Sequence, residues 1–242
     1  MLTLKPFSAA TTMSLAGAST FDLTAAEVTD LAGGVTGAGS IVIGDAAAST
    51  GAMTIGGAVN FGAKTVTLNA GSFTDGNTTG QTITATSLNL NARNAGGGIG
   101  AAGGNNAIDV AVTNLTFNTN NGGAFINATG AVNFGTGTSA VGTGAIGVTS
   151  AGAMTQSAGG AITQTAGGGA VSFDAGGNPI TLTNAGNDFT GAVALTNTGN
   201  NNIAVTDANA IQLGNVSMTA AGTGGLTVNA SGAITQAGET PR

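Results

Sequence analysis

The chain has 242 residues and a formal net charge of −6; 44 residues are Gly, while only 6% are charged and 4% are aromatic. Its four Lys and Arg residues exclude the basic surface on which nucleic acids or anionic membranes bind. The absence of Cys excludes disulfides and thiolate metal sites. Hydrophobic residues reach 41% and Pro residues number only three, so the composition predicts a folded core rather than a disordered chain.

An irregular segment with one short helix is predicted for residues 1–30. Thr24-Ala25-Ala26-Glu27 fits a capping box, in which Thr24 caps the helix and the side chain of Glu27 reaches back to the backbone of the cap. Gly33 and Gly34 then provide a stop. We expect a helix of about one or two turns, followed by a second unit over residues 31–242.

Short strands are predicted from Ser40 onward, because apolar and polar residues alternate there with a period of two. Ile41 and Ile43 form the first such pair, and Leu226 and Val228 form one of the last. Clusters of Gly, Asn, Asp and Thr separate the pairs, and Gly and Asn accept the positive φ of a sharp corner. The sequence therefore predicts strands of about three to five residues joined by tight corners.

A five-residue phrase recurs along the chain. It reads Gly-Ala-Met-Thr-Gln at Gly152 and Gly-Ala-Ile-Thr-Gln at Gly160 and Gly232, with the near copy Gly-Ala-Met-Thr-Ile at Gly51. The copies at Gly51, Gly152 and Gly232 are 101 and 80 residues apart, which are close to multiples of about 20. A unit this short buries its apolar face only against copies of itself. We therefore predict an all-β fold, a parallel β-helix (β-solenoid) with rungs of about 20 residues stacked roughly 4.8 Å apart.

The Gly-rich run from Ala95 to Asn106 is the least regular part of this pattern and predicts an insertion. Its Gly98, Gly100 and Gly103 match the spacing of a dinucleotide-binding loop. That site needs a helix N-terminus to hold the pyrophosphate, whereas Ile108–Val112 alternates like a strand. We therefore predict a loop here and no cofactor.

Three carboxylates are the candidates for catalysis, namely Asp174, Asp188 and Asp207. Asp188 and Asp207 are separated by roughly the length of one predicted rung. This spacing places them on adjacent rungs, as the paired acids of a carbohydrate-cleaving β-helix enzyme require. The alternative interpretation is that these aspartates turn the chain at corners. We favour corners, because the chain has no His and few charged residues. We predict that the chain is not an enzyme and has no catalytic, cofactor-binding or metal-binding residues.

Thr-x-Thr pairs begin at Thr65, Thr82 and Thr181 and are typical of ice-binding faces, where such pairs stack on one flat surface. The first two pairs are closer together than one predicted rung, and nothing regular follows. We therefore interpret these pairs as ordinary outward-facing strand residues.

Several phrases follow one another in a characteristic order, namely Asp22–Glu27, Ser40–Ala46 and Gly51–Ile55, and Asn184–Gly191 has a similar composition. They resemble the repeats of filamentous-haemagglutinin-like adhesins, which are large bacterial exoproteins exported by two-partner secretion. The resemblance covers most of the chain from about residue 20, and it implies a right-handed parallel β-helix, a secreted or cell-surface location and a role in adhesion. The export domain of that family carries an Asn-Pro-Asn-Gly-type turn, from which Asn178-Pro179-Ile180 departs. The resemblance therefore implies a shaft and not a secretion domain.

The leading functional hypothesis is a structural shaft segment of a secreted or cell-surface bacterial adhesin, which mediates adhesion or display. Its expected partners are glycans or proteins on host or neighbouring cells. The alternative is a subunit that self-assembles end to end into an extracellular fibre or matrix, because an uncapped solenoid end is a template for the next copy. No charged or Pro-rich cap precedes Glu239. A carbohydrate-active β-helix enzyme is a remote alternative. We expect no nucleic acid partner and no membrane insertion, since no apolar run approaches the roughly 20 residues that span a bilayer.

Overall fold

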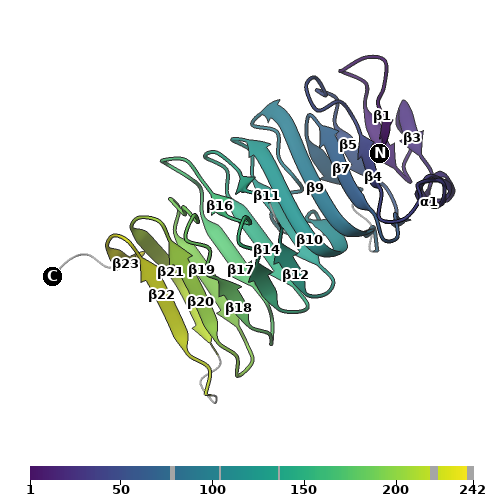
Figure 1. Cartoon of the computed structure of the whole chain (residues 1–242). Coiled ribbons are helices and arrows are strands. Elements are labelled where there is room, and N and C mark those ends of the chain that lie inside the picture. Colours follow the sequence, from purple (N-terminus) through teal and green to yellow (C-terminus); the bar gives the residue numbers. More distant parts are fainter. Residues whose placement is uncertain (77–79, 104, 136, 219–222, 239–242) are drawn as a thin grey trace.

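The computed structural model describes residues 1–242 except 77–79, 104, 136, 219–222 and 239–242. The described residues form a slender rod of stacked strands with one helix near the N-terminus, as Figure 1 shows. This helix, α1, spans Ala25–Gly34. No described helix is long and apolar enough to cross a membrane.

Most strands are short, and two in the middle of the rod are long. The strands before the middle are β1 (Leu2–Leu4), β2 (Met13–Leu15), β3 (Phe21–Leu23), β4 (Ser40–Ile43), β5 (Met53–Ile55), β6 (Val59–Asn60), β7 (Thr65–Ala70) and β8 (Phe73–Asp75). The two long strands, of 13 residues each, are β9 (Ile83–Ala95) and β10 (Ile108–Asn120). The strands after the middle are β11 (Ala124–Ala128), β12 (Val132–Phe134), β13 (Ser139–Ala140), β14 (Ile146–Ser150), β15 (Met154–Gln156), β16 (Ile162–Thr163), β17 (Val171–Asp174), β18 (Ile180–Leu182), β19 (Val193–Asn197), β20 (Ile203–Asp207), β21 (Ile211–Met218), β22 (Leu226–Ala230) and β23 (Ile234–Gln236).

Every described strand pairing is parallel, and all but the pairings of β1 and β2 join strands about one turn apart in the sequence. One column of strands runs through β4, β7, β9, β10, β12, β15, β18, β20 and β22. A second column runs through β6, β9, β10, β11, β14, β17, β19, β21 and β23. The first column marks about eight stacked turns of about 23 residues. The predicted β-solenoid is confirmed, with turns somewhat longer than the sequence predicts.

The register of the strands gives the length of each turn. Asn127 pairs with Thr149, 22 residues further on, whereas Ser87 pairs with Asn114, 27 residues further on. The longer turn contains Ala95–Asn106, so the predicted insertion is confirmed. The extra residues explain why copies of the sequence phrases lose phase across this part of the chain.

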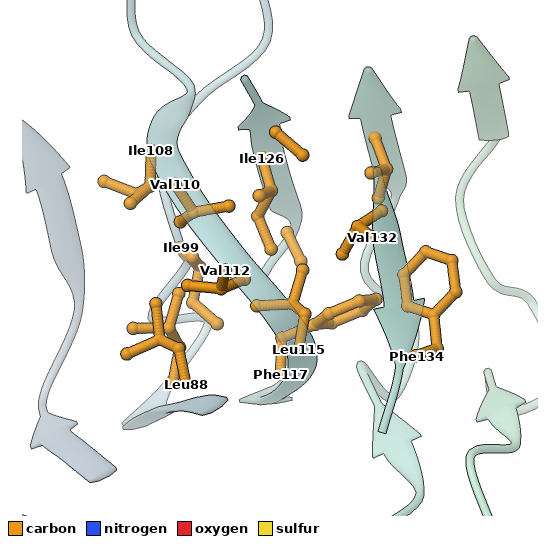
Figure 2. Close-up of a cluster of buried hydrophobic side chains, with 14 of the residues drawn as sticks. Leu88, Ile99, Ile108, Val110, Val112, Leu115, Phe117, Ile126, Val132 and Phe134 are labelled. Atoms are coloured by element: carbon orange, nitrogen blue, oxygen red, sulfur yellow. The ribbon is translucent and has the colours of Figure 1, made fainter. Parts of the chain in front are cut away.

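The core is a continuous column of small apolar side chains. Ile126 of β11 is buried, whereas its neighbours Phe125 and Asn127 are only partly covered because they lie on the outer face. Parallel pairing repeats this choice on the next turn, where Ile126 pairs with the buried Val148. Figure 2 shows the packing in the middle of the rod, where side chains of neighbouring turns meet. Each turn therefore covers the apolar side of the one before it.

Four phenylalanine rings form a chain of contacts inside the rod. The rings of Phe117, Phe134, Phe173 and Phe189 are fully buried and meet edge to face. Their successive centroid distances are 6.1, 6.0 and 5.9 Å. Edge-to-face contact is favourable because the positive edge of one ring faces the negative face of the next. The ring contacts therefore favour one alignment of the turns.

The first residues of the chain take part in the pairing. Within residues 1–30, where the sequence predicts an irregular segment, the chain forms β1, β2 and β3 as well as part of α1. The strand β1 pairs with β4, and β2 pairs with β3 and β5. Met13 and Leu15 of β2 are buried. Each of these strands has only three residues, which is too short for alternation to reveal it in the sequence.

The helix α1 begins with the predicted capping box. The N–H of Glu27 donates to Oγ1 of Thr24 (3.2 Å), and the N–H of Thr24 donates to Oε2 of Glu27 (2.9 Å). The helix is ten residues long, so it exceeds the one or two turns predicted, and Gly33 and Gly34 lie inside it. Tertiary packing extends the helix beyond the stop that the two glycines indicate.

The rod holds the helix at its N-terminal end. Val28 and Ala32 are buried against the rod, and the helix contacts β3 and β6. Nζ of Lys64 donates to the carbonyl oxygens of Val35 (2.5 Å) and Gly37 (2.6 Å), just after the helix. The helix therefore lies beside β6, the first strand of the second column.

Two copies of the Gly-Ala-Ile-Thr-Gln phrase provide a matched test of the core. Ile162 in β16 is fully buried, whereas Ile234 in β23 is 51% exposed. We expect Ile162→Ala to lower the free energy of unfolding by about 2–5 kcal/mol and Ile234→Ala by less than about 1 kcal/mol, because only the first leaves a cavity. Urea denaturation followed by circular dichroism measures both. Equal losses of unfolding free energy in the two variants would contradict a core in which each turn is covered by the next.

Candidate functional site

A buried amide holds one corner of the rod. Gln164, the last residue of a Gly-Ala-Ile-Thr-Gln phrase, is 4% exposed. Its Nε2 donates to the carbonyl oxygens of Gly144 (2.7 Å) and Gly169 (2.8 Å), and its Oε1 accepts from the N–H of Gly191 (3.1 Å). The three glycines precede β14, β17 and β19 at equivalent positions. One side chain thus satisfies backbone groups in three consecutive turns.

A second amide pair lies at a neighbouring corner. Nε2 of Gln156 donates to Oδ1 of Asn187 (2.7 Å), and Nδ2 of Asn187 donates back to Oε1 of Gln156 (3.1 Å). Asn187 is fully buried and also donates to the carbonyl oxygens of Leu182 (3.1 Å) and Thr206 (3.2 Å). The sequence interpretation missed these amides. A signal was present, because Gln ends three copies of the recurring phrase.

Asn side chains form ladders along the outer faces. Nδ2 of Asn91 donates to Oδ1 of Asn69, and Nδ2 of Asn118 donates to Oδ1 of Asn91, each over 3.1 Å. In another ladder, Nδ2 of Asn133 donates to Oδ1 of Asn114 (2.9 Å). Such bonds form only between residues at the same position in neighbouring turns. They therefore reinforce the register that the core sets.

The predicted carboxylates lie at corners. Oδ2 of Asp207 accepts from the N–H of Phe189 (2.8 Å), and Oδ1 accepts from the N–H of Asn209 (2.9 Å). Nδ2 of Asn209 donates to Oδ1 of Asp188 (3.0 Å), so Asp188 and Asp207 lie on neighbouring turns as the spacing predicts. Asp174 accepts a backbone N–H two residues further on (2.8 Å). Asp174 and Asp207 each bind a backbone N–H two residues further on, which favours the corner interpretation for these two. Asp188 binds the side chain of Asn209.

The environment of Asp207 changes its acidity. The side chain is 1% exposed, and burial raises the pKa of Asp207 above its ordinary value. The bonds from the N–H groups of Phe189 and Asn209 oppose this rise, and the carboxylate of Asp188 adds to it. Removal from water therefore outweighs the two hydrogen bonds. Across the described parts of the chain, no three His, Cys, Asp or Glu residues gather where they would hold a metal ion.

Around Gly103 the Gly-rich run of the insertion is a loop, as predicted, whereas Ile99 before it is buried and bridges Phe73 and Ala124 on the neighbouring turns. Gly100 and Gly103 have φ of +63° and +82°, in the region that favours glycine. The N–H of Ala101 donates to the carbonyl oxygen of Asn106 (2.9 Å), and Nδ2 of Asn106 donates to that of Gly103 (2.7 Å). The strand β10 follows, so the loop leads into no helix N-terminus that would hold a pyrophosphate.

The Thr-x-Thr pair of β7 stands among other residue types. Thr65 and Thr67 of β7 pair with Ser87 and Asn89 on the next turn. Asn89 donates from Nδ2 to Oγ1 of Thr67 (3.2 Å). This column mixes hydroxyl and amide side chains, as ordinary outward-facing strand residues do.

A groove of about 820 Å³ lies over the outer faces of β11 and β14. We call it the insertion groove, because residues of the insertion line it together with outward-facing strand residues. Its main lining residues are Ala101, Asn105, Asp109, Phe125, Asn127 and Thr149. It combines an aromatic ring with carboxylate, amide and hydroxyl groups, which is the usual make-up of a ligand site. The insertion groove is therefore the candidate functional site.

The repeats have a counterpart among known families. A family described as Repeats of unknown function (DUF5649) matches residues 121–196 and 200–240, which hold β11 to β18 and β20 to β23. The chain is a repeat protein. No curated protein and no solved structure matches it. The matched segments contain the amide corners at Gln156, Gln164 and Asn187, while the insertion at Ala95–Asn106 precedes them.

Gln164 and Gln236 end identical phrases and provide a matched test of the corners. Gln164 is buried, whereas Gln236 is exposed. We expect Gln164→Ala to lower the free energy of unfolding by about 2–4 kcal/mol, because buried backbone groups lose their partners. We expect Gln236→Ala to lower it by less than about 0.5 kcal/mol. Urea denaturation measures both, and wild-type midpoints in both variants would contradict the role of Gln164.

Asp207 predicts a pH dependence of stability. Because its pKa is raised in the folded chain, its contribution to stability is fully present below the ordinary pKa of 3.8 and is lost as the pH rises through the raised value. Asp207→Asn cannot ionise, but its amide nitrogen faces a backbone N–H donor and so destabilises the chain. We expect wild type to exceed the variant in melting temperature most at acidic pH, with the gap narrowing toward neutral pH. A gap independent of pH would contradict the raised pKa.

Proposed function

We propose that the chain is a structural shaft segment of a secreted or cell-surface bacterial adhesin and mediates adhesion or display. The observation that carries the proposal is the unbroken parallel pairing from β4 to β23 around one continuous core. Backbone bonds and buried apolar contacts join each turn to its neighbours, and amide corners add to them in the later turns, so a load along the rod is shared among the turns. A stiff rod of this kind holds whatever it carries away from the surface to which it is attached.

The adhesive part of the proposal comes from the resemblance to filamentous-haemagglutinin-like repeats. Of the segments that carry it, Asp22–Glu27 contains the capping box of α1 and Ser40–Ala46 contains β4. The proposed location is the bacterial surface or its surroundings, and the proposed partners are glycans or proteins of host or neighbouring cells. The outer faces of the rod support this use, because they carry polar side chains such as Asn127 and Thr149 and the chain has few charged residues.

A second candidate function is end-to-end self-assembly into an extracellular fibre or matrix. Leu226 and Ile234 in the last two strands are 39% and 51% exposed. At the other end of the rod, an apolar groove of about 720 Å³ between β1 and α1 is lined by Leu2, Leu4 and Leu23. The strands β1 and β22 belong to the same column, so a second copy stacked there continues the parallel pairing.

The helix α1 is the reason to rank the shaft first. It contacts β6, where the second column of an incoming copy would have to pair, so end-to-end stacking requires the helix to move. The sequence shows no charged or Pro-rich cap before Glu239, and residues 239–242 lie outside the described residues.

Bead retention and electron microscopy test the two functions together. We expect beads coated with the folded chain to be retained on epithelial cell layers several times more often than beads coated with the heat-unfolded chain. We expect single short rods at all protein concentrations. No gain in retention would contradict adhesion. Long filaments that disappear in Leu226→Lys, which places a charge on the exposed end, would favour the fibre.

A further inference from the structure

Phe125 faces outward from β11, and its ring lies close to two glycines of the sheet. A Cβ atom added to Gly147 on the next turn would lie 2.8 Å from Cδ1 of the ring, and one added to Gly123 would lie 2.6 Å from Cε2. The ring therefore occupies the space in which side chains at these two positions would stand. Phe125 is only partly covered and lines the insertion groove.

A row of polar side chains runs beside the ring. Nδ2 of Asn127 donates to Oδ1 of Asp109 on the preceding turn (2.7 Å), and Oδ1 of Asn127 accepts from Oγ1 of Thr149 on the following turn (2.9 Å). These bonds fix the three side chains. Hydrogen-bonding capacity remains on each of them, including the second carboxylate oxygen of Asp109 and the second amide hydrogen of Asn127. The row therefore presents fixed polar groups at the spacing of the turns, roughly 4.8 Å.

The insertion makes the groove local to one place on the rod. The turn from Ser87 to Asn114 has 27 residues, whereas the turn from Asn127 to Thr149 has 22 residues. The bond from the N–H of Ala101 to the carbonyl oxygen of Asn106 closes the extra residues into a loop. This loop lines one side of the groove. Turns without such an insertion lack this part of the lining.

Charge selects among the ligands that the groove can hold. Asp109 is the one charged residue among the described residues that line the groove, and the whole chain has a net charge of −6. Sulfated, sialylated or phosphorylated ligands are therefore repelled. The groove suits a ligand without negative charge.

Backbone pairing also limits the ligand. The floor of the groove is the middle of a sheet face, where Ile126 pairs with Ile108 on one side and with Val148 on the other. A peptide finds no open strand edge there and cannot bind by adding a strand. A neutral sugar fits better, because its C–H face packs on an aromatic ring while its hydroxyls both donate and accept hydrogen bonds.

We propose that the insertion groove binds a neutral glycan, with one sugar ring packed on Phe125 and its hydroxyls bound by Asp109, Asn127 and Thr149. The biological use of this site rests on the proposed adhesive function, for which it names the class of partner. The binding itself depends only on the groove. An adhesin shaft with such a site binds a receptor glycan directly, at one place along its length.

Isothermal titration calorimetry with the intact chain tests the proposal. The neutral probes are cellohexaose, chitohexaose and mannohexaose, and the acidic probe is a heparin hexasaccharide. We expect at least one neutral probe to bind with a Kd of about 1 mM or tighter, and the acidic probe to bind more weakly than that one. We expect Phe125→Ala to weaken neutral binding about tenfold. Phe7→Ala, which truncates an exposed ring between β1 and β2, serves as the control and leaves binding unchanged.

A second variant guards against a folding defect in Phe125→Ala. Thr149→Val removes an exposed hydroxyl and keeps the shape of the side chain, so we expect a folded chain with weaker binding. No binding of any neutral probe at about 10 mM overturns the proposal. Equal affinities of Phe125→Ala and Phe7→Ala also overturn it. Retention of coated beads without sugar binding would leave the adhesive function standing without this site, and sugar binding without retention would leave the site standing without that function.

Discussion

The register of the parallel pairing between turns is the constraint on which the rest of the structure depends. Because strand side chains alternate with a period of two, a shift of one residue in any turn sends its apolar residues outward. Ile126 pairs with Val148, and Val148 pairs with Phe173, so each inward residue meets another inward residue. The phenylalanine contacts and the Asn ladders form only at the same alignment. Backbone pairing, core packing and surface hydrogen bonds therefore all require the same register, so the turns form one continuous rod.

The corners decide where the remaining polar groups find partners. A turn of about 23 residues bends several times, and each bend leaves backbone N–H and C=O groups outside the strand ladders. Gln164 and Asn187 bind such groups across neighbouring turns. Asp207 binds the N–H of Asn209 at its own bend and the N–H of Phe189 on the preceding turn. Buried amides and one buried carboxylate thus serve the backbone. This use accounts for Asp207, while Asp188 accepts a hydrogen bond from the side chain of Asn209.

The places where this rod can bind another molecule lie where the repeat is interrupted. Regular turns offer similar small side chains on every level, and their hydrogen-bonding groups are largely occupied by the ladders. The insertion between β9 and β10 adds a loop, and the loop and Phe125 together make a groove with a shape and a polar side of its own. The two ends of the rod differ as well, because α1 covers part of one end while Leu226 and Ile234 stand exposed at the other. The function we propose for the chain therefore combines a uniform shaft with a few distinct sites.

Local patterns were enough to predict the all-β fold, the stacking of turns and the cap of the helix, because alternation, recurring phrases and the capping box of Thr24 and Glu27 can be read within short segments. It predicted too short a turn, since the spacing of phrases averages over turns of unequal length. The contacts of Phe125 with Gly147 on the next turn and of Gln164 with Gly191 could not be predicted in this way. Such partners are about a full turn apart in the sequence and meet only when complete turns are in register. The length of each turn in turn depends on how its corners pack, which no local pattern records.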